Sequence, residues 1–139
     1  MYYNPPKYPK KIVLYIRSDK EYEYDLSAES QEKHCRRYCN DNGYRIVRTV
    51  RVSCSSTDSL DVLRYLVRTL PDGVDTLLAA RFYNYSRQLP DLAALCLIFQ
   101  CRKTWVYSLD VHGPLYKQIC VIKPEDFTLA DQRYEALIR

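Results

Sequence analysis

The chain has 139 residues, which is enough for one domain with a hydrophobic core and too few for two comfortable domains. Its formal net charge is +4, but acidic residues are scattered among the basic ones, so that the sequence contains no continuous basic stripe of the kind that binds a polyanion. No apolar run approaches the roughly 20 residues that cross a bilayer, and the first ten residues lack the apolar centre of a signal peptide. We therefore expect a soluble, cytoplasmic protein with no membrane partner.

The six cysteines indicate neither a disulfide framework nor a metal site. They fall within segments of helical or strand periodicity, where buried free thiols are the usual explanation in a cytosolic protein. His34, Cys35 and Cys39 could be imagined as zinc ligands, but the paired C-x-x-C spacing of structural zinc sites is absent. We expect no bound metal.

The N-terminal third of the chain predicts an arm, a strand and a helix. Residues 1–10 contain three prolines and three tyrosines and read as an extended arm. The apolar run at residues 10–17 is typical of a strand buried on both faces of a sheet. A helix is predicted from Ser27, its N-cap, to about Asn42, where Gly43 provides a left-handed stop. Its apolar stripe consists of Ala28, Cys35, Tyr38 and Cys39.

The remaining chain continues the alternation of strands and helices. The expected elements are strands at 44–52, 74–82 and 103–109, helices at 60–70 and 89–99, a candidate fifth strand at 118–123 and a final helix at 124–139. Such an order implies right-handed crossovers and parallel strands. We predict an α/β three-layer sandwich with a mostly parallel sheet of four or five strands. The expected organisation is the arm (1–10), an α/β domain (11–123) and the C-terminal helix.

Functional groups in such a sheet gather beyond the carboxyl ends of the strands. The segments at that edge are residues 17–25, 53–59, 83–87 and 110–115. None of them contains a glycine-rich phosphate loop, which argues against a nucleotide-binding domain and against a nucleotide cofactor. Neither histidine, His34 or His112, is placed beside a serine or carboxylate as a hydrolase triad requires.

Three short motifs follow one another along the chain, at the ends of the first and third strands and at the start of the first helix. Residues Tyr15–Asp19 end the first strand in a pattern similar to Tyr-x-Arg-x-Ser, Ser27–Gln31 opens the first helix as Ser-x-x-x-Gln, and residues 84–87 follow the third strand where an Arg-x-x-Arg turn would stand. From about Lys11 to Asp110, the chain resembles the N-terminal domain of the serine recombinases, the resolvase and invertase family. That resemblance implies the same fold and a role in DNA recombination.

The chemistry implied by the resemblance is metal-free phosphoryl transfer, in which a serine hydroxyl attacks a DNA phosphate held by several arginines. Arg17 and Arg87 match two of the family's arginines. The nucleophile's position, however, holds Asp19, whose carboxylate would repel a phosphate. Asn84 replaces the first arginine of the turn.

Two further departures affect the same site. Tyr83 stands at the acidic or polar position before the turn, and Leu60 aligns with the arginine that precedes the second helix. Because several catalytic positions have changed together, we predict a domain that has lost catalysis and acts through protein or DNA binding. Arg17, Arg87 and Arg81 are the predicted residual anion-binding residues, although the first two could instead pair with Asp19.

An active recombinase is the alternative. Ser18 would then be the nucleophile, turned into the site by a local bulge, with Arg17 and Arg87 beside it and charge from Arg81 or Arg64. The structural interpretations compete with these roles. They make Ser18 a hydroxyl bonded to backbone, Arg64 part of a solvated helix face, and Arg81 a side chain that reaches solvent at the sheet edge.

The expected partners are DNA, bound weakly or without sequence specificity because no DNA-reading module is present, and a second copy or an active recombinase. Apolar residues of the last helix could be core or interface: Phe127, Leu129, Tyr134 and Leu137. Outside the family, a flavodoxin-like binding module would share only the fold. Tyrosines interleaved with lysines in the arm could also stack on single-stranded bases.

Overall fold

The computed structural model describes residues 10–19, 26–54, 59–111, 113–115 and 124–139. Within these ranges, four strands form one sheet in the order β2-β1-β3-β4, with every neighbouring pair parallel. The strands are β1 (Lys11–Asp19), β2 (Arg45–Cys54), β3 (Thr76–Ala79) and β4 (Trp105–Ser108). The helices are α1 (Ala28–Asp41), α2 (Ser59–Thr69), the short 3-10 helix η2 (Phe82–Asn84), α3 (Leu89–Cys101) and α5 (Pro124–Ile138).

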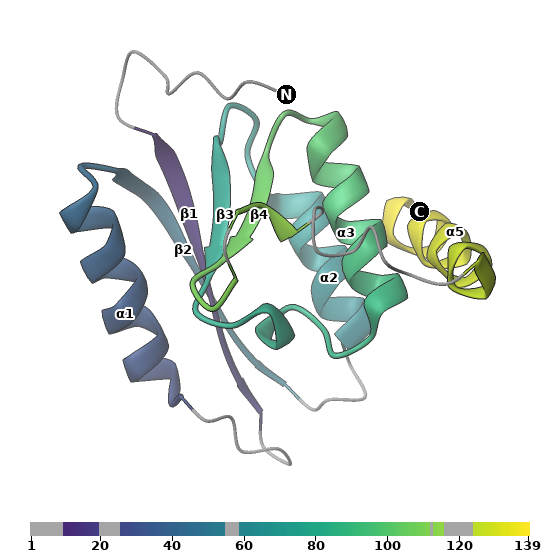
Figure 1. Ribbon diagram of the computed structural model, residues 1–139, viewed down its shortest axis with the longest axis horizontal. Coiled ribbons are helices and arrows are strands. Elements are labelled where there is room, and N and C mark those ends of the chain that lie inside the picture. The colour runs from purple at the N-terminus through teal and green to yellow at the C-terminus, as the bar shows by residue number, and fades with distance from the viewer. Residues whose placement is uncertain (1–9, 20–25, 55–58, 112, 116–123) are drawn as a thin grey trace.

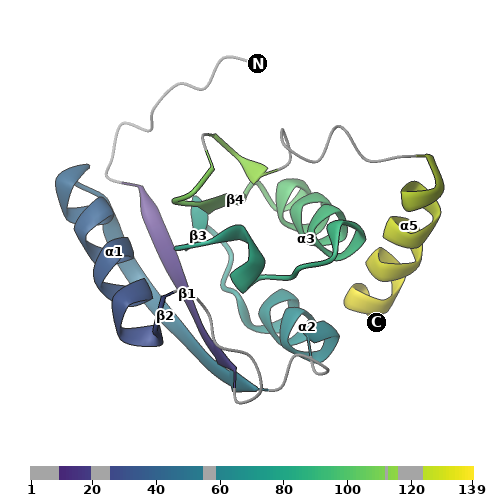
Figure 2. The same ribbon diagram turned by 60° about the horizontal axis from the view of Figure 1, so that its bottom comes forward.

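Helices cover both faces of the sheet (Figure 1). Helix α1 lies on one face, whereas α2 and α3 lie on the other, with α5 outside them (Figure 2). The predicted three-layer α/β sandwich with a parallel sheet is therefore confirmed. The candidate fifth strand at 118–123 and residues 1–9 of the arm lie outside the described residues.

Strand β1 is the centre of the core because both of its faces are buried. Val13 and Tyr15 pack with α2 and α3, whereas Ile12, Leu14 and Ile16 pack with α1. The two neighbours of β1 differ in length. Strand β2 pairs with it along its whole length, but β3 pairs with it only from Ile12 to Leu14. Strands β3 and β4 have four residues each, which is shorter than the sequence predicts. Strand β3 is short because the chain leaves the sheet after Ala79 and forms η2.

Strand β2 contains one extra residue relative to β1. Ile12 pairs with Ile46, but Val13 pairs with Arg48, so that Val47 is a β-bulge. Beyond it, Val50 joins the core beside α2 and α3. Arg51 instead faces α1, where its guanidinium contacts Glu32.

Helix α1 begins and ends as predicted. The side chain of Ser27 accepts a hydrogen bond from the backbone N–H of Ser30, and Gly43 follows the helix at φ +69°. Cys35 and Cys39 are fully buried against the sheet, whereas Tyr38 is exposed at the margin of the stripe. Gln31, which the apolar pattern did not include, is fully buried.

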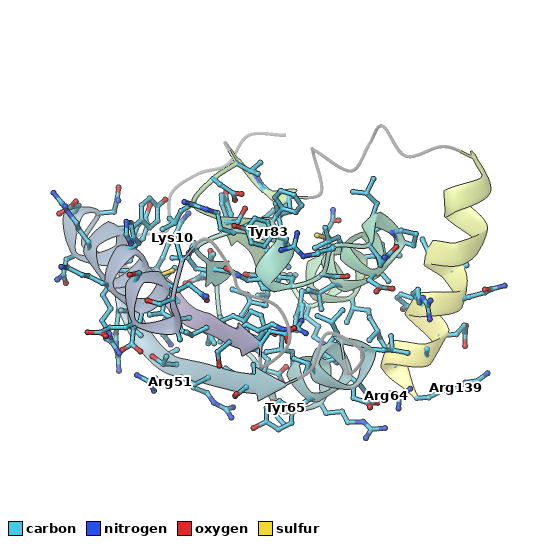
Figure 3. All side chains as sticks on the ribbon, turned by 90° about the horizontal axis from the view of Figure 1, so that it is seen from below. Lys10, Arg51, Arg64, Tyr65, Tyr83 and Arg139 are labelled. Atoms are coloured by element: carbon cyan, nitrogen blue, oxygen red, sulfur yellow. The ribbon has the colours of Figure 1, made fainter. Side chains whose placement is uncertain are left out.

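Helix α5 packs on α2 and α3 within the same chain. Leu137 is fully buried in their core and Tyr134 packs partly against it, so both are intramolecular core residues. Arg64 Nε donates to the carbonyl of Ala136 at 3.0 Å, beside the end of α5 (Figure 3). The prediction of a solvated Arg64 was wrong because α5 covers that side of α2. The side chains of Phe127 and Leu129 lie outside the described part of the chain.

Over the described ranges, no helix combines the length and the apolar character needed to cross a bilayer.

Candidate functional site

The candidate site lies at the carboxyl ends of β1, β3 and β4. Strand β1 contributes its last residues, Arg17 to Asp19, and the segment after β3 contributes η2 and the residues up to Arg87. Asp110 follows β4 and accepts a hydrogen bond at Oδ1 from the N–H of Phe82 at 3.2 Å. This bond links the segment after β4 to the first turn of η2.

Arg17 is part of the protein interior. Its residue is 1% exposed, and the register with Val52 places it on the face of β1 that α2 and α3 cover. The Gln31 side chain holds its backbone, with Nε2 donating to Arg17 O at 2.8 Å and Oε1 accepting from Arg17 N at 3.0 Å. A guanidinium buried in this way does not present itself to a phosphate arriving from solvent.

Ser18 lies on the opposite face of β1, toward α1. Its Oγ donates to the carbonyl of Val52 at 3.5 Å, in agreement with the interpretation of a hydroxyl bonded to backbone. A hollow of about 390 Å³ adjoins it. The residues that line this hollow are Ile16, Ser18, Ala28, Glu29, Glu32, Arg51, Val52 and Ser53. Two carboxylates therefore share the surroundings of the only serine near the nucleophile's position in the described strand.

The carboxylate of Glu32 beside this hollow is ionised and tied in place. Arg36 Nε lies 2.8 Å from it, and Arg51 donates to both of its oxygens at 2.8 and 2.9 Å. The hydrogen bond from Arg36 and then those from Arg51 lower the pKa of Glu32 against the opposing effect of burial. The guanidinium of Arg51, which lines the hollow beside Ser18, is thus already paired with a carboxylate.

Asp19, which the resemblance aligns with the nucleophile, lies on the same face of β1 as Arg17, because successive strand residues alternate between faces. Asp19 is half-buried. Where the resemblance requires a hydroxyl next to an arginine, the chain presents a carboxyl group.

The turn after β3 is built around Asn84 rather than an arginine. Asn84 is 1% exposed, and its Oδ1 accepts from the N–H of Arg81 at 3.0 Å. Its amide nitrogen is buried and has no hydrogen-bond partner among the described residues. Arg81 is half-buried, with Nη1 3.4 Å from the carbonyl of Ala80.

Arg87 is the exposed arginine of this edge. Its guanidinium lies 4.6 Å from the centroid of the Tyr83 ring, a cation–π contact. Tyr83 therefore positions Arg87 in solvent, whereas Arg17 is enclosed. The two arginines that match the family stand in different environments.

Tyr85 is a residue of the site that the sequence did not single out. Its ring stacks on Tyr15 at 5.2 Å between centroids and 8° between planes, and its hydroxyl donates to Tyr107 O at 3.0 Å. Burial raises the pKa of the Tyr85 hydroxyl well above its usual range. An aromatic residue inside a polar turn, directly after Asn84, is the signal that could have indicated this anchor.

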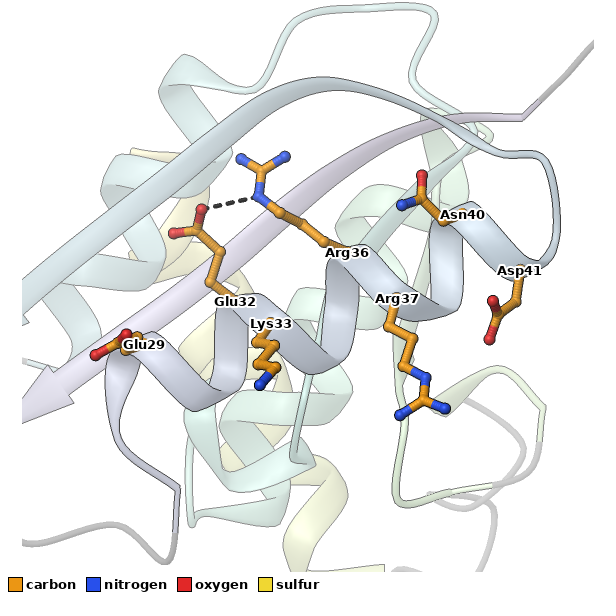
Figure 4. A pocket seen from close by; sticks show the side chains of 7 residues that line it. All are labelled: Glu29, Glu32, Lys33, Arg36, Arg37, Asn40 and Asp41. Carbon is orange, nitrogen blue, oxygen red and sulfur yellow. Dashed lines mark hydrogen bonds and ion pairs between the residues drawn. The ribbon is translucent and has the colours of Figure 1, made fainter.

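Two other features carry no site. Residues of α1 line a second surface hollow, but all of them come from that one helix, and two of them, Glu32 and Arg36, are paired with each other (Figure 4). No group of three or more His, Cys, Asp or Glu side chains in the described ranges is placed to hold a metal ion, and this includes His34 with Cys35 and Cys39.

Comparison with known proteins gives a family and a fold. The family model "Resolvase, N terminal domain" matches residues 12–119. No curated protein is similar enough to the chain to match it.

Three solved structures are similar over nearly the whole chain. They are the N-terminal catalytic domain of TP901-1 integrase (18% identity, 94% of this chain and 99% of that chain, TM-score 0.60), the C-terminal catalytic domain of ISC1926 TnpA, an IS607-like serine recombinase (17%, 93% and 99%, 0.57), and a resolvase family site-specific recombinase from Streptococcus pneumoniae (17%, 93% and 96%, 0.64). At these identities the likeness concerns the fold.

Proposed function

Since the family model for the resolvase N-terminal domain matches residues 12–119, the chain belongs to the resolvase family. We propose that it is a serine recombinase domain that has lost strand cleavage and takes part in DNA recombination by binding protein or DNA. The observation that carries this proposal is the position of Asp19. The resemblance aligns it with the nucleophile, and it lies on the face of β1 shared with Arg17. A carboxylate there repels the phosphate that a serine would attack.

The surroundings of Ser18 support the same proposal. An in-line attack requires the hydroxyl and the guanidinium groups on one side of the phosphate. Ser18 faces α1 while Arg17 faces α2 and α3, and no rotamer change moves a strand residue to the other face. The one arginine that lines the hollow beside Ser18, Arg51, is already bound by Glu32.

Binding is proposed to involve DNA and a second recombinase subunit, either another copy or an active relative, in the cytoplasm. Of the anion-binding residues predicted, Arg87 is exposed and best placed to meet a phosphate, whereas Arg17 and Arg81 are more enclosed. We retain as part of this proposal the division into an arm (1–10), an α/β domain (11–123) and a C-terminal helix (124–139).

The test is a search for a covalent protein–DNA adduct. The purified chain and its Ser18→Ala variant are incubated with a library of random-sequence duplexes, denatured, and probed for DNA that remains attached to protein. An active serine recombinase with the same library is the positive control. We expect no adduct from either form of this chain. An adduct formed by the unaltered chain and absent from Ser18→Ala would establish the alternative, an active recombinase using Ser18.

Binding is measured separately by the shift of labelled duplex at several salt concentrations. The expected result is weak binding that weakens further with salt, because phosphate contacts release counterions. Arg87→Gln should reduce it, and Arg37→Gln, an exposed arginine of α1 far along the chain from the site, serves as the matched control. Equal effects of the two substitutions would remove the assigned role of Arg87.

A further inference from the structure

The side chain of Lys10 is enclosed by aromatic rings at the edge of the sheet opposite the candidate site. Its Nζ lies 5.3 Å from the centroid of the Tyr44 ring and 5.7 Å from that of the Tyr107 ring. The residue is only 9% exposed, and it precedes β1 directly (Figure 3). Both distances are within the roughly 6 Å at which a ring face attracts a cation.

The backbone fixes Lys10 in this position. Its carbonyl accepts from the N–H of Arg45 at 2.8 Å, and the next residue, Lys11, donates its N–H to Asp75 Oδ2 at 2.7 Å. The start of β1 is thus hydrogen-bonded on one side to β2 and on the other side to the segment that leads into β3. The lysine side chain is placed between the two rings by the sheet itself.

The side chains around Lys10 leave almost no empty space beside it. A third ring, Tyr38, packs edge-on against Tyr44 at 5.9 Å, and Thr76 closes the floor. Only about 10 Å³ of space remains among these side chains, room for one water molecule at most. The hydroxyl of Thr76 is buried there and has no hydrogen-bond partner in the described part of the chain, which leaves a polar atom available to the ammonium group or to that water.

From this arrangement we infer that Tyr44 and Tyr107 form a binding site for a primary alkylammonium group, and that the chain's own Lys10 occupies it. The inference is independent of the proposed function, because Lys10, Tyr44 and Thr76 lie at the amino ends of β1, β2 and β3, away from the candidate site. The rings supply the attraction for the charge, and Ile12, Leu78 and Thr76 supply the walls that exclude water from it. Occupation by Lys10 fixes the backbone that leads into β1.

The decisive experiment empties the site and refills it. Lys10→Ala removes three methylene groups and the ammonium, which together correspond to n-propylammonium. We expect the thermal midpoint of Lys10→Ala to fall, and saturating n-propylammonium to restore most of the loss. The neutral 1-propanol, of matching size, should not restore it. The unaltered protein and Lys33→Ala, which removes an exposed lysine of α1, should not respond to either compound.

An equal response of Lys10→Ala to n-propylammonium and 1-propanol, or a response to neither, would overturn the inference. If Lys10→Ala does not fold, Lys10→Met decides, because it fills the same space without a charge. We then expect a midpoint below that of the unaltered protein. The difference should shrink when both proteins also carry Tyr107→Leu, because one of the two rings that attract the charge is then gone. A Lys10→Met midpoint equal to or above that of the unaltered protein would show that the rings do not select a cation.

Discussion

The side-chain amide of Gln31 bonds to both backbone groups of Arg17, accepting from its N–H at 3.0 Å and donating to its carbonyl at 2.8 Å. It does so beyond the point where β3 stops pairing with β1, and it therefore takes the place of a neighbouring strand. A third bond, from Nε2 to the carbonyl of Leu26 at 3.0 Å, joins the segment before α1 to the same amide. Gln31 thus connects α1 to the end of the central strand.

Gln31→Leu should destabilise the protein by about 2–4 kcal/mol, because two buried backbone groups would lose their partners. The measurement is the free energy of unfolding in urea. Gln100→Leu is the control, since it makes the same change at an exposed glutamine of α3 and should cost no more than about 0.5 kcal/mol. Similar losses for the two variants would contradict the role of Gln31.

The Tyr15–Tyr85 stack predicts an ordered series at Tyr85. Tyr85→Phe keeps the ring but removes the bond to Tyr107 O, at a cost of about 1 kcal/mol. Tyr85→Leu also loses the ring pair and leaves unfilled volume, which should raise the total to about 2–4 kcal/mol. Urea unfolding gives both values, with Tyr65→Phe at an exposed position as the control. A Tyr85→Phe variant as unstable as Tyr85→Leu would show that the hydroxyl, not the stack, dominates.

Adjacent residues of α5 test whether this helix is part of the folded core. Leu137 is fully buried and Ile138 is 47% exposed. Leu137→Ala should lower the free energy of unfolding by about 2–4 kcal/mol, and Ile138→Ala by less than about 1 kcal/mol. Losses of equal size would mean that α5 does not dock on α2 and α3 in solution.

The cysteines should react with iodoacetamide at very different rates. Burial raises the pKa of the Cys35 and Cys96 thiols to about 12 and that of Cys39 to about 11, from an ordinary value of 9.0. Cys101 is exposed. Peptide mapping after brief labelling should find Cys101 modified at least about a hundredfold faster than the three buried thiols, since the thiolate is the reactive form. The difference should vanish in urea; its absence in the native protein would indicate that α1 and α3 open readily.

Asp91 gives the protein a specific dependence on pH. Burial raises its pKa above 3.8, although Arg133 at 3.1 Å and the hydroxyl of Ser86 oppose the shift. The stability that a raised carboxyl pKa contributes is complete below pH 3.8 and is lost as the pH rises through the folded-state value. Asp91→Asn should therefore gain stability relative to the unaltered protein across that interval. Urea unfolding at several pH values measures the difference; a constant difference would contradict the shift.

The order of the elements follows from the sequence because each has a periodic apolar pattern and a recognisable stop. Ser27 and Gly43 delimit α1 by local backbone chemistry that needs no tertiary information. The sequence predicts too great a length for β3 and β4 for the opposite reason. An apolar run continues past Ala79, and only the pairing partners decide where the ladder ends.

For the candidate site, the sequence predicts which face of β1 each residue lies on but not how deeply each side chain is buried. The alternation of faces along β1 separates Ser18 from Arg17, and that separation follows from sequence alone. The burial of Arg17 and the docking of Arg64 on Ala136 depend on helices that arrive from distant parts of the chain. Gln31 was matched to a family motif, but a polar residue on a helix reveals its burial only when its partner is in place.

The bulge at Val47 sets the phase of every later residue in β2. Before it, Ile46 faces α1; after it, Val50 and Val52 face the opposite core while Arg51 faces Glu32. If β2 instead continued without a bulge, with Val47 opposite Val13, the two faces would be exchanged, and the arginine would turn inward and the valines toward α1. In a relative whose strand has no bulge, the apolar residues after this point come one position earlier in the sequence. A correct alignment with such a relative must therefore place a gap at Val47.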